Sequence, residues 1–159
     1  MSQPVLSQPV MSQPVLSPLV YVLNGPNLNL LGMREPEIYG DDTLDDIAGM
    51  LEDRAQELGL EIDMRQSNHE GHLIDWLHEA QAEGARAVLL NAGAYTHTSV
   101  ALHDAIKAIR TPVIEVHLSN PHKREAFRHQ SFVGMAALGT VAGFGANSYV
   151  VALEAVAKL

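Results

Sequence analysis

The sequence predicts an α/β fold in which one parallel β-sheet is covered by helices on both faces. Short apolar segments alternate with longer segments whose apolar residues recur at helical spacing. The alternation repeats five times, which is typical of parallel strands joined by helical crossovers. The chain has 159 residues, 47% hydrophobic and 18% charged, which suits one domain with a sizeable core. Because the first strand comes so early, we predict a flavodoxin-like three-layer sandwich with five strands in the order 2-1-3-4-5.

The first strand–helix–strand unit has clear boundaries. Leu19–Leu23 is a short apolar run that predicts a buried strand. Thr43, with Asp46 three positions later, predicts a capping box at the start of a helix, and Gly59 predicts its end. Leu60–Met64 alternates apolar and polar residues and predicts the second strand. The Gly- and Pro-rich stretch from residue 23 to residue 40 is expected to be irregular.

The remaining elements follow the same alternation of strand and helix. The later strand candidates are Ala87–Leu90, Val113–Val116 and Met135–Val141. The later helix candidates are an apolar stripe over Leu73–Ala80 that Gly84 closes, then Ser99–Ile109, a short helix around Lys123–Phe127, and Ala146–Lys158.

The first residues form a repeat of different composition. Ser-Gln-Pro-Val followed by Leu or Met recurs with a period of five over residues 2–16. Proline at this spacing prevents a helix and interrupts a central strand. We therefore expect residues 1–18 to be a flexible, polyproline-like tail and residues 19–159 to be a single domain. The alternative is an arm that packs its Val and Leu side chains on a neighbouring subunit.

Composition restricts the possible partners. The net charge of −9 argues against a nucleic-acid or anionic-membrane surface, because binding phosphates needs concentrated Lys and Arg. No apolar run is long enough to cross a bilayer, so no membrane partner is expected. There is no cysteine, which leaves neither disulfides nor thiolate chemistry. An anionic small substrate remains possible if a few arginines act locally against the overall charge.

Polar side chains follow four of the five predicted strands. The carboxyl ends of parallel strands meet at one edge of the sheet, where such folds bind ligands. We therefore expect a polar small-molecule site on this edge. The segments concerned are Asn24–Asn27, Gln66–Gly71, Asn91–Ser99 and Glu115–Pro121, with Arg124 and Arg128 just beyond.

Glu115 and His117 are two residues apart on a predicted strand, so they share a face. A carboxylate beside an imidazole fixes its tautomer and suits it to act as a general acid. The alternative is a buried ion pair with a purely structural role. No cofactor or metal is expected, because the sequence lacks cysteine, an HExxH pair, a P-loop and a dinucleotide fingerprint, and the missing G-x-S-x-G elbow argues against a serine nucleophile.

Taken in chain order, these strand-end segments closely resemble type II 3-dehydroquinate dehydratases. The matching stretches are GPNLNLLGMREPEIYG, RQSNHEG, LNAGAYTHTSVALHDAI, IEVHLSN, the Arg124/Arg128 pair and GFGANSY. They extend from Val20 to Leu153, nearly the whole chain apart from the repeat. The resemblance implies reversible dehydration of 3-dehydroquinate to 3-dehydroshikimate through an enolate, without a metal or organic cofactor. This reaction belongs to the shikimate pathway, which leads to chorismate and the aromatic amino acids.

The resemblance also implies a role for each matching residue. Tyr39 matches the base that removes a proton next to the ketone, and Arg34 matches the arginine that activates it. Asn27 matches the residue that holds a water against the enolate oxygen. His117 matches the acid that protonates the departing hydroxyl, and Glu115 matches its orienting partner. The other matches are the substrate contacts Asn91, His97, Leu118, Ser119 and Arg128, the supporting residue Arg124, and Asp104, which completes the site of a neighbouring subunit.

The implied chemistry has a physical requirement. A free tyrosine has a pKa of about 10, so a tyrosine base needs a guanidinium close by in a dry site. An imine mechanism is not favoured, since none of the lysines (Lys107, Lys123 and Lys158) ends a predicted strand.

The family further implies a cytoplasmic dodecamer built as a tetramer of trimers. The competing hypothesis is a flavodoxin-like domain that binds a small molecule without turnover.

Overall fold

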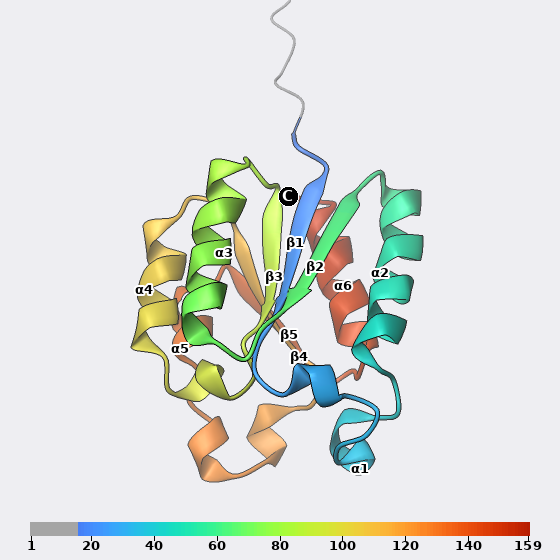
Figure 1. The fold of residues 1–159 in the computed structure, drawn as a ribbon, viewed down its shortest axis with the longest axis vertical. Helices are drawn as coiled ribbons and strands as arrows, with labels where there is room; N and C mark the ends of the chain where they lie inside the picture. Colours follow the sequence, from blue (N-terminus) through green and yellow to red (C-terminus); the bar gives the residue numbers. More distant parts are fainter. Residues whose placement is uncertain (1–15) are drawn as a thin grey trace, which may run out of the picture.

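The computed structural model describes residues 16–159 and has the three layers predicted from the sequence (Figure 1). Its sheet is fully parallel, with the order β2-β1-β3-β4-β5, which confirms the predicted topology. The strands are β1 (Leu19–Asn24), β2 (Glu61–Gln66), β3 (Ala87–Asn91), β4 (Val113–His117) and β5 (Gly139–Ala142). The prediction of a flexible tail concerns mainly residues 1–15, which lie outside the described residues.

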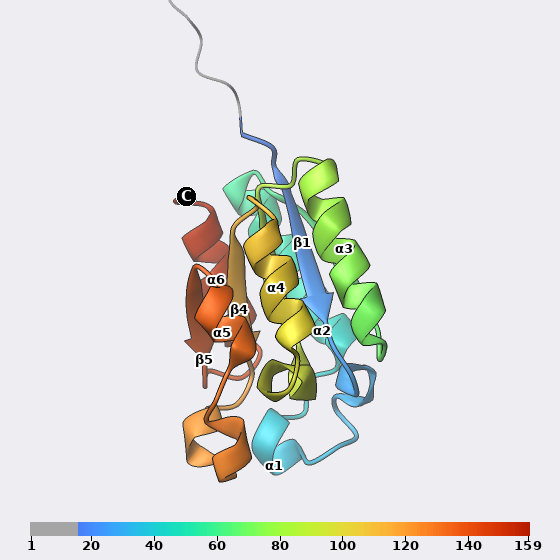
Figure 2. The ribbon, with the colours of Figure 1, turned by 90° about the vertical axis from the view of Figure 1, so that its left-hand side faces the viewer.

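Helices cover both faces of the sheet, as Figures 1 and 2 show. One face carries α2 (Leu44–Leu58) and α6 (Asn147–Val156), and the other carries α3 (Glu70–Ala82), α4 (Val100–Ala108) and α5 (Phe132–Ala136). Successive side chains of β1 enter opposite cores: Val20 and Val22 pack under α2 and α6, whereas Tyr21 and Leu23 pack under α3 and α4. The central strands are therefore apolar on both faces, as expected of a doubly covered sheet.

The first long helix has the predicted ends. Thr43 Oγ1 accepts a hydrogen bond from the Asp46 backbone nitrogen (3.1 Å), and Asp46 Oδ2 accepts one from the Thr43 nitrogen (2.9 Å). This reciprocal pair is the capping box predicted for the start of α2. Gly59 ends the helix with a left-handed φ of 70°, which glycine adopts without a steric penalty. Within residues 16–159, no helix is long and apolar enough to span a bilayer.

The stretch from residue 25 to residue 40 is more regular than the sequence predicted. It contains a 3₁₀ turn, η1 (Leu28–Leu30), and a one-turn helix, α1 (Pro36–Tyr39). Proline at the first helical position is pre-organised for helix because its φ is already fixed. At the base of the stretch, a Cβ on Gly25 would lie 2.4 Å from the Ala92 carbonyl oxygen, so only glycine fits there.

Two predicted elements after β4 are wrong in part. The first part of the predicted strand Met135–Val141 belongs to the short helix α5, and β5 begins only at Gly139. Ser131 starts α5 by accepting a hydrogen bond from the Gly134 nitrogen (2.7 Å), a capping signal that the apolar run obscured. The helix predicted around Lys123–Phe127 is instead two 3₁₀ turns, η3 (Pro121–Lys123) and η4 (Ala126–Arg128), because the intervening backbone at Arg124 is extended.

Candidate active site

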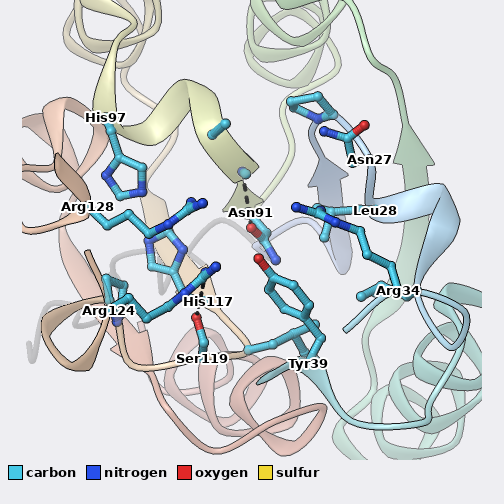
Figure 3. Close-up of a pocket in the computed structure, with 16 residues that line it drawn as sticks. Asn27, Leu28, Arg34, Tyr39, Asn91, His97, His117, Ser119, Arg124 and Arg128 are labelled. Carbon is cyan, nitrogen blue, oxygen red and sulfur yellow. Dashed lines mark hydrogen bonds between the residues drawn. The ribbon is translucent and has the colours of Figure 1, made fainter. Parts of the chain in front are cut away.

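A pocket lies at the carboxyl ends of β1, β3 and β4, as the parallel topology predicts (Figure 3). The loop with α1 and the loop with η3 and η4 lie at this same end of the molecule although they are far apart in sequence (Figure 2). Ten of the twelve predicted site residues line the pocket. They are Asn27, Arg34, Tyr39, Asn91, His97, His117, Leu118, Ser119, Arg124 and Arg128.

Two arginines lie beside the ring of Tyr39 in the pocket. The guanidinium carbon of Arg34 is 5.3 Å from the ring centroid, and that of Arg124 is 5.1 Å from it. Both distances are within the range of a cation–π interaction. The Arg34 guanidinium also contacts the exposed Glu35 carboxylate at 3.4 Å, which offsets part of its charge. Tyr39 nevertheless has two guanidinium groups beside its ring. The expected proximity of Arg34 and Tyr39 is thus present, and Arg124 is a second cation that sequence reasoning had given only a supporting place.

His117 is paired with a buried carboxylate. Its Nε2 lies 3.1 Å from Glu115 Oε2, and the Glu115 residue is only 3% exposed. Burial by itself raises the pKa of Glu115, but His117, Ser131 and Thr140 donate hydrogen bonds that outweigh burial and hold this pKa below its ordinary 4.5. Glu115 is therefore an anion near neutral pH, and it holds the His117 ring by its Nε2.

Neighbouring elements fix the position of Glu115. Ser131, the residue that caps α5, donates its hydroxyl hydrogen to Oε2, and Thr140 on β5 donates to Oε1 over 2.9 Å. A Cβ on Gly134 would lie 2.9 Å from the same Oε1, so α5 packs directly on the carboxylate. Sequence reasoning missed Ser131 and Thr140. Ser131 could have been recognised as a helix cap, but the contact of Thr140 depends on the register in which it pairs with Glu115.

His97 faces the pocket as a neutral imidazole. Its Nδ1 lies 2.8 Å from the Gln130 carbonyl oxygen, which can only accept, so Nδ1 carries the ring hydrogen. Burial lowers the pKa of His97, and the Gln130 hydrogen bond opposes this only in part. The Nε2 atom is consequently free to accept a hydrogen bond from a ligand hydroxyl.

Three further residues surround the pocket with polar groups. Asn27 has a left-handed φ of 69°, and its backbone nitrogen donates to Asn68 Oδ1 at 3.0 Å. Arg124 Nη1 donates to Ser119 Oγ over 3.4 Å. Arg128 Nε contacts the Glu125 carboxylate at 2.7 Å, which orients the guanidinium at the pocket wall.

Two predicted site residues do not line the pocket. Glu115 is behind His117, in keeping with an orienting role. Asp104 is on α4 with its side chain 71% exposed, and its carboxylate pairs with His103 Nδ1 at 2.9 Å. The pocket of this chain therefore does not include Asp104. Among residues 16–159, no group of three or more His, Asp and Glu side chains is arranged to hold a metal ion.

The fold and the pocket together define a class of protein: a flavodoxin-like α/β protein whose strand-end pocket is lined by groups suited to acid–base chemistry on a small polar molecule. A tyrosine beside two arginines and a histidine beside a buried carboxylate are the groups that such chemistry needs. The chain belongs to the type II dehydroquinase family. The family model described as "Dehydroquinase class II" matches residues 18–157.

Close relatives and solved structures agree with this membership. The chain is 59% identical over 140 residues to a 3-dehydroquinate dehydratase of Rhizobium johnstonii, which covers 88% of this chain and 96% of that protein. It is 60% identical over 140 residues to the 3-dehydroquinate dehydratase of Phenylobacterium zucineum, with the same coverage of 88% and 96%. The type II dehydroquinase structure from Propionibacterium acnes superposes with a TM-score of 0.85 and 43% identity, over 91% of this chain and 99% of that one.

Proposed function

We propose that this chain catalyses the dehydration of 3-dehydroquinate to 3-dehydroshikimate, a step of the shikimate pathway. One observation carries the proposal: a single pocket holds Tyr39 beside Arg34 and Arg124, together with His117 paired to Glu115. A base and an acid in one cleft are what an elimination of water requires. The names of the close relatives support the same reaction.

In the first step, Tyr39 as phenolate removes a proton from the carbon next to the ketone. The electron pair of that C–H bond moves into the enolate, so negative charge develops on the former ketone oxygen. Asn27, which precedes η1 in the loop after β1, would hold a water that donates a hydrogen bond to this oxygen and stabilises its negative charge. The guanidinium groups of Arg34 and Arg124 favour the negative charge that the tyrosine oxygen carries before it takes up the proton.

In the second step, the enolate reforms the ketone and expels the hydroxyl. His117 donates a proton to the departing oxygen, so the C–O bond breaks and water leaves. Glu115 stabilises the protonated imidazole and keeps the ring in position for transfer. The proton gained by Tyr39 then returns to His117 through solvent, which restores both groups and balances the cycle.

The substrate is an anion, and the pocket has local positive charge to receive it. Arg34, Arg124 and Arg128 line the pocket of a chain whose net charge is −9. Clustered cations in a cleft dominate the local potential even when the whole protein is acidic. The remaining contacts proposed for the substrate carboxylate and hydroxyls are Asn91, His97, Leu118 and Ser119.

Among the described residues 16–159, none that lines the pocket carries an amine that could form an imine with the ketone. Lys107, Lys123 and Lys158 are all exposed, and none of them lines the pocket. We therefore expect that borohydride added with substrate leaves no covalent adduct. A lysine trapped by reduction would contradict the enolate mechanism.

The proposal extends to the assembly. We propose a cytoplasmic dodecamer, a tetramer of trimers, in which Asp104 of one subunit completes the site of its neighbour. The exposed position of Asp104 outside its own pocket is compatible with this arrangement. Such a contact would make an isolated subunit incomplete.

Addition of 3-dehydroquinate to the purified protein tests the activity directly. The product is a conjugated enone, so its ultraviolet absorbance should rise with time. Tyr39→Phe is the matched control, because it keeps the ring and removes only the hydroxyl. Binding of the substrate without turnover in the wild-type protein would favour the non-catalytic binding domain and refute the enzyme.

A further inference from the structure

A buried tyrosine connects two strands beneath the pocket. Asn24 and Asn91 end the adjacent strands β1 and β3, and they pair in register. Tyr149 of α6 is fully buried, and its hydroxyl lies between the two amides. The hydroxyl oxygen is 2.6 Å from Asn24 Oδ1 and 2.9 Å from Asn91 Nδ2. Tyr149 does not line the pocket, whereas Asn91 does.

Two backbone groups determine the direction of every hydrogen bond in this network. The Arg65 carbonyl can only accept, so Asn24 must turn its Nδ2 toward it, at 3.0 Å, and its Oδ1 toward Tyr149. The Tyr149 hydroxyl therefore donates to Asn24 and accepts from Asn91 Nδ2. At the other end, the Gly93 N–H can only donate, and it meets Asn91 Oδ1 at 3.2 Å. The amide of Asn91 is thus held in one of its two possible orientations.

The protonation state of Tyr149 suits both of its hydrogen bonds in this network. Burial raises the pKa of Tyr149, so the hydroxyl keeps its hydrogen across the physiological range. A neutral hydroxyl can donate and accept at once, which the two amides require. One Nδ2 hydrogen of Asn91 is used by Tyr149, and the second remains for a ligand. If the Asn91 amide were flipped, a ligand at this position would meet the acceptor Oδ1 in place of the donor Nδ2.

We propose that Tyr149 is a positioning residue that fixes the Asn91 amide in the orientation that binds substrate. The proposal rests on the proposed function, because it assigns Asn91 a contact with 3-dehydroquinate. It adds a residue from α6, on the far side of the sheet from α3 and α4, to the machinery of the site. Tyr149 acts only through Asn91, since its own hydroxyl is covered by the two amides.

Steady-state kinetics of Tyr149→Phe provide the test. Asn91 contacts the substrate in the ground state and the transition state alike, so we expect KM to rise by about tenfold while kcat changes by less than about twofold. A variant that merely lost folded protein would show the opposite pattern, with lower apparent kcat and unchanged KM. Tyr21→Phe is the matched control: Tyr21 is also buried, on β1, but it faces the opposite core, and we expect wild-type values.

A double-mutant cycle with Asn91→Ala decides whether Tyr149 acts through Asn91. In that background, Tyr149→Phe should change KM by less than about twofold, because the amide it orients is gone. A KM effect of equal size in both backgrounds, or an unchanged KM in the folded single variant, would overturn the proposal.

A second variant keeps the proposal testable if Tyr149→Phe does not fold. Asn24→Ala removes the acceptor of the Tyr149 hydroxyl, which frees the hydroxyl to rotate and should raise KM in the same direction. An unchanged KM in folded Asn24→Ala would then count against the proposal. Wild-type protein without any turnover would instead refute the proposed function itself.

Discussion

Replacing Ser131 by alanine would remove two interactions that one hydroxyl makes, and their different pH dependence tells them apart. Ser131 Oγ accepts a hydrogen bond from the Gly134 nitrogen (2.7 Å), which caps α5, and it donates its hydrogen to the buried Glu115 carboxylate. Loss of a serine cap costs about 1 kcal/mol. Loss of a hydrogen bond to a charged group costs about 1.5–3 kcal/mol. We therefore expect Ser131→Ala to lower the free energy of unfolding at pH 7 by about 3 kcal/mol.

The two contributions differ in their dependence on pH. The pKa of Glu115 is below 4.5 in the folded protein, so its ionised contacts contribute stability above that value. This stability is lost as the pH falls through the lower, folded pKa. Ser131→Ala removes one of the contacts that lower the pKa. The difference between wild type and variant should therefore shrink by about 2 kcal/mol between pH 7 and a pH below the folded pKa of Glu115, leaving only the cap.

Urea unfolding followed by circular dichroism, at one protein concentration, measures the free energy of unfolding at both pH values. Ser99→Ala is the matched control, because Ser99 Oγ also caps a helix, accepting from the Leu102 nitrogen at 2.9 Å, but contacts no carboxylate. Its cost should be about 1 kcal/mol at both pH values. An equal, pH-independent cost for the two serines would refute the claim that Ser131 stabilises ionised Glu115. Ser131→Ala should also lower kcat, because in the proposed mechanism Glu115 orients His117.

Three further predictions concern the reaction and the assembly. Tyr39→Phe should lower kcat by about 10²–10⁴-fold, as expected for loss of a general base, while Tyr95→Phe, whose hydroxyl bonds the Asn68 carbonyl, keeps wild-type rates; more than a tenth of wild-type kcat in Tyr39→Phe would exclude it as the base. Arg128→Ala should raise KM by about tenfold or more and leave kcat nearly unchanged, because the proposed contact with the substrate anion would be made both before and during the reaction; a fall confined to kcat would contradict a binding role. If Asp104 completes a neighbouring site, specific activity should fall in step with dissociation measured by light scattering, and fully active monomers would exclude this role.

Much of the fold could be read from local signals. The central strands β1, β3 and β4 are largely apolar runs, which are buried because helices cover both faces of the sheet. Thr43 and Gly59 set the ends of α2 through contacts within a few residues, so their effect does not depend on the rest of the chain. The strand ends identified the position of the pocket, because parallel topology alone brings the carboxyl ends of the strands to one edge of the sheet.

The sequence by itself determined the order of the elements, the edge of the sheet that carries the site, and which residue types gather there. Only the tertiary structure decided the partners of those residues, because the partners are distant in the chain. Thr140 reaches Glu115 through the register of β5, and Tyr149 reaches Asn24 and Asn91 across the sheet from α6. Hydrogen bonds between residues so far apart in sequence leave no periodicity and no local motif, so they become visible only when packing brings the elements together.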